Sequence, residues 1–422
     1  MKTYDLIVVG GGFSGTAAAV AAARGGASVL LIERANCLGG AAAGCLVFPY
    51  MNYHTTLNGE RVALSRGLFT EINERLAAFN ALDGAIDGCR FHDEYLKIVL
   101  ADMAEEAGVD LLFHTVLSDC TVSEGRVESI ETVNKSGKTT FRAKYFIDAT
   151  GDGDLCHLAG FPMRLGREPD HLCQPMTLCF RLSGIDADAF YAEYPKMQTL
   201  YQEFREKGKI TNPREDILTF RPLTDGVIHF NSTRIVKRNP TDAFDLTAAE
   251  LDARRQVLEL FRLLKENFSS CKQAHLLSTA TEIGVRESRM ACGEYTLTEK
   301  DLKECKKFPD AVAYGNYDID IHNPEGSGTS HYYFKAGEYY TIPYRSLIPK
   351  GSRNLLVAGR CISATHEAQA SIRIMPIVTC IGEAAGSAAA LAAKENLPVS
   401  EISVPALRET LYASGALTHT LD

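Results

Sequence analysis

The sequence predicts an α/β protein in which a Rossmann-like dinucleotide-binding domain is interrupted by an inserted α+β domain. Three observations predict this fold. A strand, a glycine-rich turn, a helix and a second strand fill residues 4–33. Three short strands are expected within residues 116–145, before an apolar segment that has the pattern of a parallel strand. Near residue 359 a second strand, glycine and helix unit returns, so the nucleotide-binding domain is expected to be built from both ends of the chain.

The first unit reads YDLIVVG, then GGGFSG, then an alanine-rich helix. Gly10, Gly12 and Gly15 fit the pattern GxGxxG, in which the first glycine permits a tight turn, the second lets the backbone approach a pyrophosphate and the third allows close helix packing. Phe13 and Ser14 complete this turn and open the helix. The helix N-terminus offers unpaired N–H groups and a positive dipole end to phosphates.

Glu33 ends the second strand. A carboxylate at this position accepts hydrogen bonds from both hydroxyls of an adenosine ribose and repels a 2′-phosphate. Strand, glycine turn, helix and acid together are far more specific than a GxGxxG pattern alone, and they predict a dinucleotide site.

Three further segments indicate which dinucleotide binds. After Glu33 comes RANCLGG, which contains Arg34, Gly39 and Gly40 and resembles the E-R-x(4)-G-G extension of FAD-binding flavoproteins. The segment YFIDATGDGDL resembles the motif that closes an FAD domain, and NLLVAGRCIS resembles the late segment that meets the flavin. These two resemblances add the following residues to the expected FAD site: Ala149, Thr150, Gly151, Asp152, Gly359 and Arg360.

Nearly the whole chain resembles the FAD-dependent oxidoreductase family, which includes many bacterial members of unassigned substrate and is distantly related to fumarate reductase and thiazole synthase flavoproteins. The stretches LCQPMTLCFRLSGID, EIGVRESRMACGEYTLTEKDL and YYTIPYRSLIP also carry this resemblance. It implies a glutathione-reductase-type FAD domain with a three-stranded β insertion, and FAD as the cofactor. It also implies that the backbone of Leu117 meets the adenine, that Arg360 meets the pyrophosphate, and that the N–H groups of Ile374 and Met375 face the flavin.

The expected domain limits are residues 1–160 for the first part of the FAD domain, 161–345 for the substrate or cap domain, and 346–422 for the second part and a C-terminal helix. The segment Leu246 to Phe268 has the pattern of an amphipathic helix, with acidic residues early and basic residues later. We expect it on the outside of a cap that covers the flavin, because flavin chemistry needs a site from which water is excluded.

Candidate catalytic residues follow from side-chain chemistry and position: His322, Arg289, Tyr344, Arg345, His366 and Arg373. His322 is suited to general acid–base work near neutral pH. Arg289 is a candidate for binding a substrate anion, and it would share a helix face with Arg286 if VRESR were helical, although both arginines equally suit an ion-pair network. Tyr344 and Arg345 precede the return to the FAD domain. His366 and Arg373 lie in the turn 359–376, which we expect to be a loop beside the flavin, where they either face substrate or shape the pocket wall.

Composition limits the possible partners and the compartment. The net charge of −9 disfavours binding to nucleic acid. No apolar run is expected to be long enough to span a bilayer, and the first residues have no signal-peptide pattern, so the protein is expected in the cytoplasm. The twelve cysteines form no CxxC and no zinc-type or ferredoxin-type spacing, so no metal site is expected.

The predicted function is that of an FAD-dependent oxidoreductase that transfers hydride between flavin N5 and a C–OH or C–C centre of a small polar substrate. A flavin monooxygenase is a second possibility, although ATGDGDL resembles the corresponding GADG segment only loosely. A third is a flavin-binding subunit of an electron-transfer complex, which would exchange electrons with a donor or acceptor protein.

Overall fold

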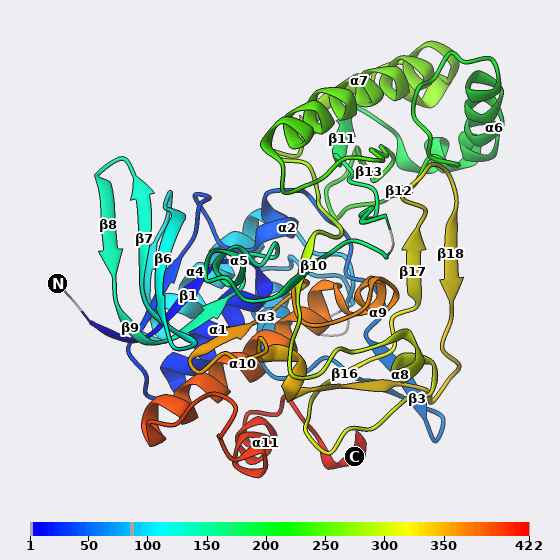
Figure 1. Ribbon diagram of the computed structural model, residues 1–422. Helices are drawn as coiled ribbons and strands as arrows, with labels where there is room; N and C mark the ends of the chain where they lie inside the picture. Colours follow the sequence, from blue (N-terminus) through cyan, green and yellow to red (C-terminus); the bar gives the residue numbers. More distant parts are fainter. Residues whose placement is uncertain (1–2, 85–87, 169, 422) are drawn as a thin grey trace.

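The computed structural model describes residues 3–84, 88–168 and 170–421, and it is built around one parallel sheet (Figure 1). The sheet has five strands in the order β20-β9-β1-β2-β5. Their bounds are β1 Tyr4–Val9, β2 Val29–Ile32, β5 Asp110–Leu112, β9 Ala143–Asp148 and β20 Leu355–Val357. Val9 is in register with Ile32 on one side and Asp148 on the other, so three strands end at one edge. The predicted Rossmann-like α/β fold, closed by a strand from near the end of the chain, is confirmed.

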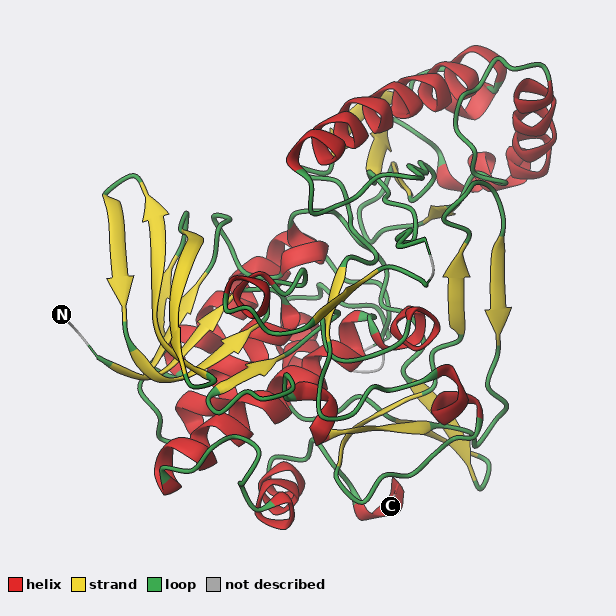
Figure 2. Ribbon diagram, viewed as in Figure 1, coloured by secondary structure: helices red, strands yellow, loops and turns green. Residues whose placement is uncertain are grey.

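Helices from both ends of the chain pack together beside this sheet. α1 (Phe13–Arg24) lies against α10 (Met375–Glu395). A Cβ atom on Gly382 would lie 2.0 Å from the Ser14 carbonyl oxygen, and one on Gly386 would lie 2.1 Å from that of Ala18. The two helices therefore touch backbone to backbone. The other α-helices of the described residues outside the cap are α2 Gly40–Ala43, α3 Leu68–Ala78, α4 Asp93–Glu106, α5 Asp154–Leu158, α8 Glu299–Lys303, α9 His366–Ile372 and α11 Val404–Ala413 (Figure 2).

α10 corrects one expectation from the sequence. By length and composition alone it could cross a membrane, whereas no such run was expected. Its most apolar window is 89% buried inside the protein. Contact with α1 and with the central sheet explains this composition, because a helix that is covered on most sides needs small apolar residues almost all round.

The expected three-stranded insertion is an antiparallel meander of β6 (Val116–Ser123), β7 (Arg126–Asn134) and β8 (Gly137–Phe141). It projects from the edge of the molecule next to β9 (Figure 1). The third strand was expected to continue to residue 145. Instead it ends at residue 141, and Ala143 begins β9 of the parallel sheet.

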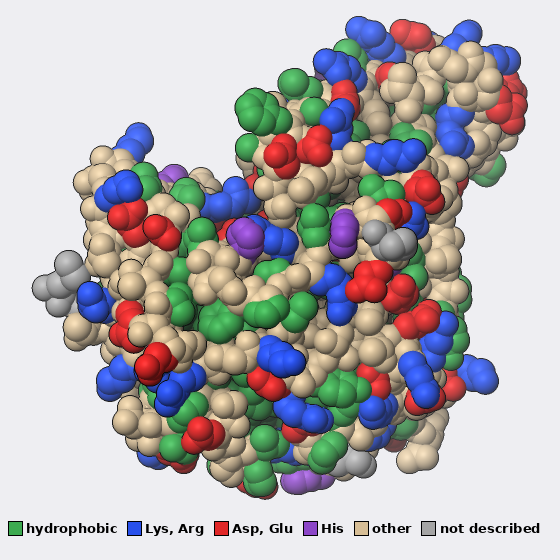
Figure 3. Space-filling model, in the orientation of Figure 1, with side chains coloured by type: hydrophobic (Ala, Val, Ile, Leu, Met, Phe, Trp, Pro, Cys, Tyr) green, Lys and Arg blue, Asp and Glu red, His purple; other side chains and the backbone are tan. Residues whose placement is uncertain are grey.

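The cap is a separate layer above the FAD half, as the view in Figure 1 shows. Its four-stranded sheet has the order β12-β13-β11-β14 and is covered by two long helices. The bounds are β11 Phe180–Ser183, α6 Ala187–Glu206, β12 Thr219–Phe220, β13 Val227–Phe230, α7 Ala243–Asn267 and β14 His275–Thr279. The amphipathic helix expected in this region is α7. In Figure 3 the surface is hollowed between the cap and the meander.

Two hydrophobic cores divide the chain. Apart from Leu46, the cap core is built from buried residues between positions 176 and 283, whereas buried residues from 291 onwards join the core of the FAD half. The segment 291–345 therefore packs as part of the lower body, although the expected cap limits of 161 and 345 remain a prediction. The remaining short strands are β3 His54–Leu57, β4 Glu60–Ala63, β10 Met163–Leu165, β15 Arg289–Ala291, β16 Ala311–Gly315, β17 Ile319–His322, β18 Thr329–Tyr332 and β19 Tyr340–Pro343.

One local prediction was wrong, and one open alternative is decided by the structure. The turn 359–376 is not only a loop, because α9 (His366–Ile372) forms within it. Thr365 is the N-cap of this helix, and its side chain accepts a hydrogen bond from the N–H of Ala368 at 3.3 Å. Threonine is a favoured N-cap residue. The condition under which Arg286 and Arg289 would share a helix face is not met, because VRESR is not helical and Arg289 begins β15.

Candidate functional site

The glycine loop before α1 has the geometry of a phosphate cradle. A Cβ atom on Gly10 would lie 2.4 Å from the Ala149 carbonyl oxygen, and one on Gly15 would lie 1.8 Å from that of Gly10. Gly12 differs, since its backbone is in an ordinary region (φ −66°) and a Cβ atom there would have nothing closer than 3.9 Å. Gly10 and Gly15 are therefore required by the fold itself. Gly12 instead leaves space in front of the helix N-terminus, where a pyrophosphate is expected.

The second glycine pair lies directly against this loop. The N–H of Gly39 donates to the carbonyl of Gly11 at 2.9 Å, and a Cβ atom on Gly40 would lie 2.9 Å from the Cα of Gly12. Gly39 and Gly40 both have positive φ angles, 111° and 47°. Glycine is thus required at the place where two backbone segments form one wall of the site.

Glu33 is buried at the end of β2 and is held by the backbone. Its Oε2 accepts from the N–H of Gly11 at 2.6 Å and its Oε1 from that of Ala35 at 2.7 Å. A carboxylate retains further lone pairs beyond these two bonds, so ribose hydroxyls still find acceptors. Arg34 is mostly exposed and forms an ion pair with Glu282, so in this structure its charge points to the cap.

Two buried polar atoms beside the cradle have no hydrogen-bond partner among the described residues: Oγ of Ser14 and Nε of Arg360. Gly359, which precedes Arg360, approaches Ser14 closely, because a Cβ atom on Gly359 would lie 3.4 Å from the Cβ of Ser14. Unpaired buried donors are uncommon and costly in native proteins. A pyrophosphate would accept hydrogen bonds from both, so the residues present fit FAD.

The segment after β9 completes this wall. Arg360 donates from Nη2 to the Asp152 carboxylate at 2.5 Å and lies over Gly151, whose φ is +81°. Thr150 donates to Oδ1 of the buried Asp148 at 2.7 Å. Burial acts to raise the pKa of Asp152, but the charge of Arg360 and the hydrogen bond from Ser288 lower it. This carboxylate therefore stays ionised and holds Arg360 in place.

Two predicted contacts with the ends of FAD lie on regular elements. Ile374 is the N-cap of α10 and Met375 is its first residue, so their N–H groups belong to the set that has no partner within the helix. Leu117 is half-buried on β6 and pairs with Thr132 of β7. Contact of these residues with FAD remains a prediction.

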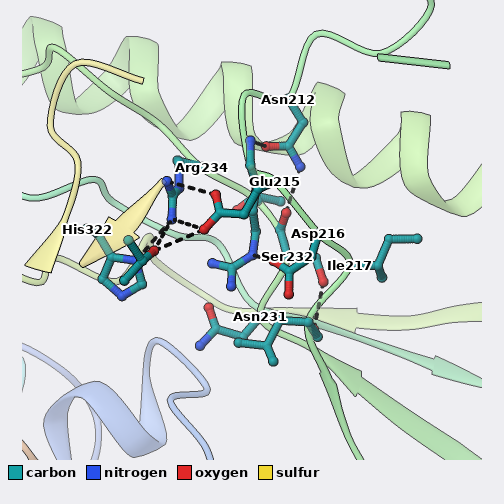
Figure 4. Close-up of polar contacts among 12 residues, drawn as sticks. Asn212, Glu215, Asp216, Ile217, Asn231, Ser232, Arg234 and His322 are labelled. Carbon is teal, nitrogen blue, oxygen red and sulfur yellow. Dashed lines mark hydrogen bonds and ion pairs between the residues drawn. The ribbon is translucent and has the colours of Figure 1, made fainter. Parts of the chain in front are cut away.

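Above the FAD half, Arg234 organises a buried polar cluster (Figure 4). Its side chain is 1% exposed, and its Nη1 forms an ion pair with Glu215 at 3.1 Å. Its Nη2 donates to Nδ1 of His322 at 3.0 Å. Burial acts to raise the pKa of Glu215, but backbone hydrogen bonds and the charge of Arg234 outweigh it and lower it to about 2.

These contacts fix the protonation of His322. A guanidinium only donates, so Nδ1 of His322 is the acceptor and the ring proton is on Nε2, which lies 3.3 Å from Oδ2 of Asp320. Burial and the charge of Arg286 lower the pKa of His322 to about 3. The ring is thus neutral at pH 7. Its role in proton transfer remains a prediction.

Asp320 links this cluster to α9. Arg373, which follows α9, places Nη2 3.6 Å from Oδ2 of Asp320, and the Tyr317 hydroxyl donates to the same oxygen at 3.0 Å. Burial alone would raise the pKa of Asp320, yet the hydrogen bond from His322 and the charge of Arg373 hold it well below its usual range. His322 and Arg373, both predicted from the sequence, are brought together here.

His366 lies in a neighbouring network. Its Nδ1 is 2.8 Å from Oε1 of Glu287, a carboxylate with no exposed surface, and Oε2 of Glu287 accepts from the N–H of Gln174 at 2.8 Å. Gln174 in turn donates to Gln369 of α9 at 3.3 Å. His366 is therefore enclosed by polar partners at the junction of cap and FAD domain.

Arg289 lies at the cofactor segment and not in the cap cluster. Its Nε donates to the carbonyl of Asp152 at 3.0 Å, and its Nη2 pairs with Asp154 at 2.5 Å. Burial and the charges of Asp148 and Asp152 raise the pKa of Asp154 to about 6. The role of Arg289 toward a substrate anion remains a prediction, and its observed partners are carboxylate and backbone groups of the FAD half.

Tyr344 and Arg345 share no partner with the other candidates. The buried Tyr344 hydroxyl donates to the carbonyl of Val399 at 2.7 Å, and burial raises its pKa. Arg345 pairs with Asp310 at 2.9 Å near the surface. Both contacts are typical of structural residues, so these two predicted roles receive no support from the geometry.

Several residues of this cluster and of the His366 network had no signal in the sequence, namely Gln174, Glu215, Arg234 and Gln369, and the same holds for Asn231, which accepts a hydrogen bond from Arg286. They come from cap loops, from the segment after β13 and from α9, so only the fold brings them together. Arg286 was recognised as a charged residue, but its environment was not.

One group of side chains has metal-ligand chemistry. Asp318, Asp320 and His331 place ligand atoms within 4.8 Å of one another on the β17–β18 hairpin and the residue before it. Asp320 is already paired with Arg373 and His322, and His331 lies 2.5 Å from Asp318. These ion pairs account for the group without a cation.

Comparisons of the sequence with known proteins identify a family and one related enzyme. A sequence model of the family described as FAD dependent oxidoreductase matches residues 5–411. Thiamine thiazole synthase of Methanococcus aeolicus is 29% identical over 178 residues, and the alignment covers 40% of this chain and 60% of that enzyme. Less than two thirds of this curated relative is thus matched.

Solved structures resemble the chain more distantly. p-Nitrophenol 4-monooxygenase PnpA from Pseudomonas putida DLL-E4 is 11% identical, with a TM-score of 0.49 and coverage of 100% of this chain and 91% of that one. A geranylgeranyl bacteriochlorophyll reductase-like protein from Thermoplasma acidophilum is 15% identical, with a TM-score of 0.47 and coverage of 100% and 90%. These likenesses bear on neither substrate nor reaction.

Proposed function

Because the chain belongs to the FAD dependent oxidoreductase family, we propose that it transfers hydride between N5 of the flavin and a C–OH or C–C centre of a small polar substrate. Membership makes the protein an FAD-dependent oxidoreductase, as the motifs predicted. One observation carries the finer proposal: the cap cluster is joined to α9, and α9 leads directly into the N-terminus of α10, where the flavin is expected.

The bound FAD supplies the hydride acceptor or donor. The chain supplies the rest. The cap covers the junction with the FAD half, and a covered site excludes water from the substrate. When a C–OH group is oxidised, its carbon loses hydride and its oxygen loses a proton. His322 is the predicted acceptor for this proton. The lone pair of its neutral ring is at Nδ1, so the substrate would take the place of Nη2 of Arg234, which lies there at 3.0 Å.

A substrate screen under anaerobic conditions tests the proposal. Purified protein should be yellow and should release FAD on denaturation. Candidate small alcohols, hydroxy acids and saturated acids would then be mixed with it without oxygen, and bleaching of the flavin would be recorded. Bleaching by such a compound alone supports hydride transfer. Product formation that requires both NADPH and oxygen would contradict it and favour a monooxygenase.

The electron partner is tested separately. A flavin that is reduced by substrate must pass two electrons onward before a second turnover. Reoxidation would be measured with oxygen, quinones and an extract of the source cell. Turnover only with a proteinaceous fraction would favour the electron-transfer alternative.

A further inference from the structure

Four arginines lie where the cap meets the FAD half, a region that we call the cap junction, and they differ in which carboxylates they pair with. Arg234 pairs with Glu215 at 3.1 Å, Arg373 lies 3.6 Å from Asp320, and Arg214 pairs with Asp216 at 2.9 Å; the remaining arginine is Arg286. Within residues 3–84, 88–168 and 170–421, no carboxylate forms an ion pair with Arg286. Arg286 is therefore the one of these four arginines that has no carboxylate at ion-pair distance among the described residues, and the charge of Asp320 acts on it only from further away.

Arg286 is held by neutral groups. Its Nη1 donates to the Pro175 carbonyl at 2.7 Å and to Oγ1 of Thr177 at 2.5 Å, and its Nη2 donates to Oδ1 of Asn231 at 3.4 Å. Three of the five guanidinium N–H groups thus donate to described residues, and the other two donate to none of them. Burial and the charges of Arg373, Arg214 and Arg234 lower the pKa of Arg286 to about 9. The surroundings therefore disfavour the positive charge of Arg286, and a bound anion would stabilise that charge.

Two further donors in the junction are unused. Arg214 is 5% exposed, and its buried Nη1 has no hydrogen-bond partner among the described residues. Asn231 is half-buried; it accepts from Arg286 through Oδ1, and its Nδ2 donates to no described residue. The buried, unpaired Nη1 of Arg214 points to a missing hydrogen-bond partner, and cationic donors favour an anionic partner.

Arg286 lies where a ligand would meet both domains. Its carbonyl accepts from Nε2 of Gln369 at 2.8 Å, which ties it to α9 and hence to the N-terminus of α10. On the other side, Gly284 approaches the loop after α2, because a Cβ atom on it would lie 3.5 Å from the Cβ of Cys45. The arginine is thus fixed between two segments that wall the expected flavin end.

We propose that Arg286, with Asn231 and Arg214, forms a subsite for an oxyanionic group of the substrate, a carboxylate or a phosphate ester. This rests on the proposed function for its place in the reaction, although the binding of the anion does not depend on turnover. The planar guanidinium fork matches both carboxylate and phosphate oxygens. The subsite would hold the charged end of a substrate while the reacting carbon faces the flavin.

Direct binding measurements test this subsite. Malonate, inorganic phosphate and the neutral malonamide would be titrated into the FAD-loaded protein by calorimetry, which needs no turnover. We expect at least one anion to bind and malonamide not to bind. Malonate and phosphate separate the two oxyanion sources. Equal binding of malonamide and malonate would overturn the proposal, as would the absence of binding by both anions.

Variants assign the binding to Arg286. Arg286→Met should weaken anion binding by about 10- to 100-fold, the usual effect of losing a charge-assisted pair, and Arg286→Lys should weaken it less. Arg254→Met removes an exposed arginine from the same cap and serves as the matched control. Unchanged affinity in Arg286→Met would overturn the assignment.

Asn231→Asp gives a second test, which keeps Arg286 in place and so does not require the protein to fold without this arginine. It keeps the acceptor for Arg286 and adds a carboxylate beside it, so it should raise the melting temperature while abolishing anion binding. Asn239→Asp makes the same charge change in a cap loop and should do neither. Anion binding retained in Asn231→Asp would contradict the subsite.

The two proposals fail in distinguishable ways. Anion binding that depends on Arg286, without flavin reduction by any hydroxylated or saturated anion, would leave the subsite standing and sink the hydride-transfer proposal. Flavin reduction by a neutral substrate, equally fast in Arg286→Met, would do the reverse.

Discussion

The two halves of the site recognise their ligands by different means. The FAD cradle is made of backbone: glycines at positions 10, 12, 39 and 40 and the first turns of α1 and α10 leave space and offer N–H groups. The cap junction is made of charged side chains that form ion pairs with one another, except that Arg286 has no ion-pair partner among the described residues. A site made of backbone fits one ligand, because its shape is set by the fold. A site made of side chains can differ between proteins of the same fold, so that each binds another substrate.

The largest expected effect breaks the cradle without breaking the fold. Gly12→Val should abolish FAD retention, because its side chain would enter the space in front of α1 while touching no protein atom closer than 3.9 Å at Cβ. Flavin absorbance and circular dichroism would be recorded together. Gly386→Val is the contrasting variant and should yield no folded protein, since its Cβ atom would lie 2.1 Å from a backbone oxygen. A flavinated, folded Gly12→Val protein would refute the assignment of the pyrophosphate.

A second prediction concerns the junction alone. His322→Ala should leave the FAD spectrum intact but slow flavin reduction by substrate about 100-fold, at the lower end for lost proton transfer. His322→Asn, which can still accept from Arg234, separates positioning from proton transfer: recovery of the rate would assign a positioning role. Because the pKa of His322 is lowered to about 3, the rate should show no histidine ionisation between pH 5 and 8. Stopped-flow reduction at several pH values measures both.

The charge of Arg286 predicts a pH limit for anion binding. Its pKa is lowered to about 9, so the free protein loses this positive charge as pH rises through 9, and affinity for an anion should fall about tenfold by pH 10. Calorimetric titration of malonate from pH 7 to 10 would show it. In the Arg254→Met control the affinity for malonate should fall over the same pH range as in the unaltered protein. In Arg286→Lys the fall in affinity should occur at a different pH.

The smallest effect is on stability. Glu215 has a pKa of about 2 in the folded protein, below its ordinary value of 4.5, so its contribution is present above pH 4.5 and is lost as pH falls toward 2. Glu215→Gln should lower the free energy of unfolding by about 1 kcal/mol at pH 7, a modest figure because the carboxylate is partly exposed. The difference from the unaltered protein should shrink by pH 3 in denaturant titrations. A constant difference would contradict this account.

The contrast between the halves also explains what the sequence could predict. The cradle depends on residues that are close in sequence and on places where only glycine fits. Gly10, Gly15, Gly39 and Gly40 could therefore be recognised from the sequence pattern alone. The junction depends on Glu215, Arg234, Arg286 and Asp320, which are ordinary charged residues until the fold places them together. The spacing of Arg286 and Arg289 suited a helix, but pairing of β15 with β10 placed Arg289 in a strand. α9 was missed because its seven residues lie between stronger turn signals.

The backbone contact between α1 and α10 has a consequence for synthesis. A ribosome makes α1 early and α10 some 350 residues later, so the contact of Gly382 and Gly386 with Ser14 and Ala18 forms only after nearly the whole chain has been made. The cap core, whose residues lie almost entirely between 176 and 283, is complete well before then. We therefore expect the nascent chain to hold a finished cap above an unfinished nucleotide domain, and to acquire its cofactor only near the end of translation.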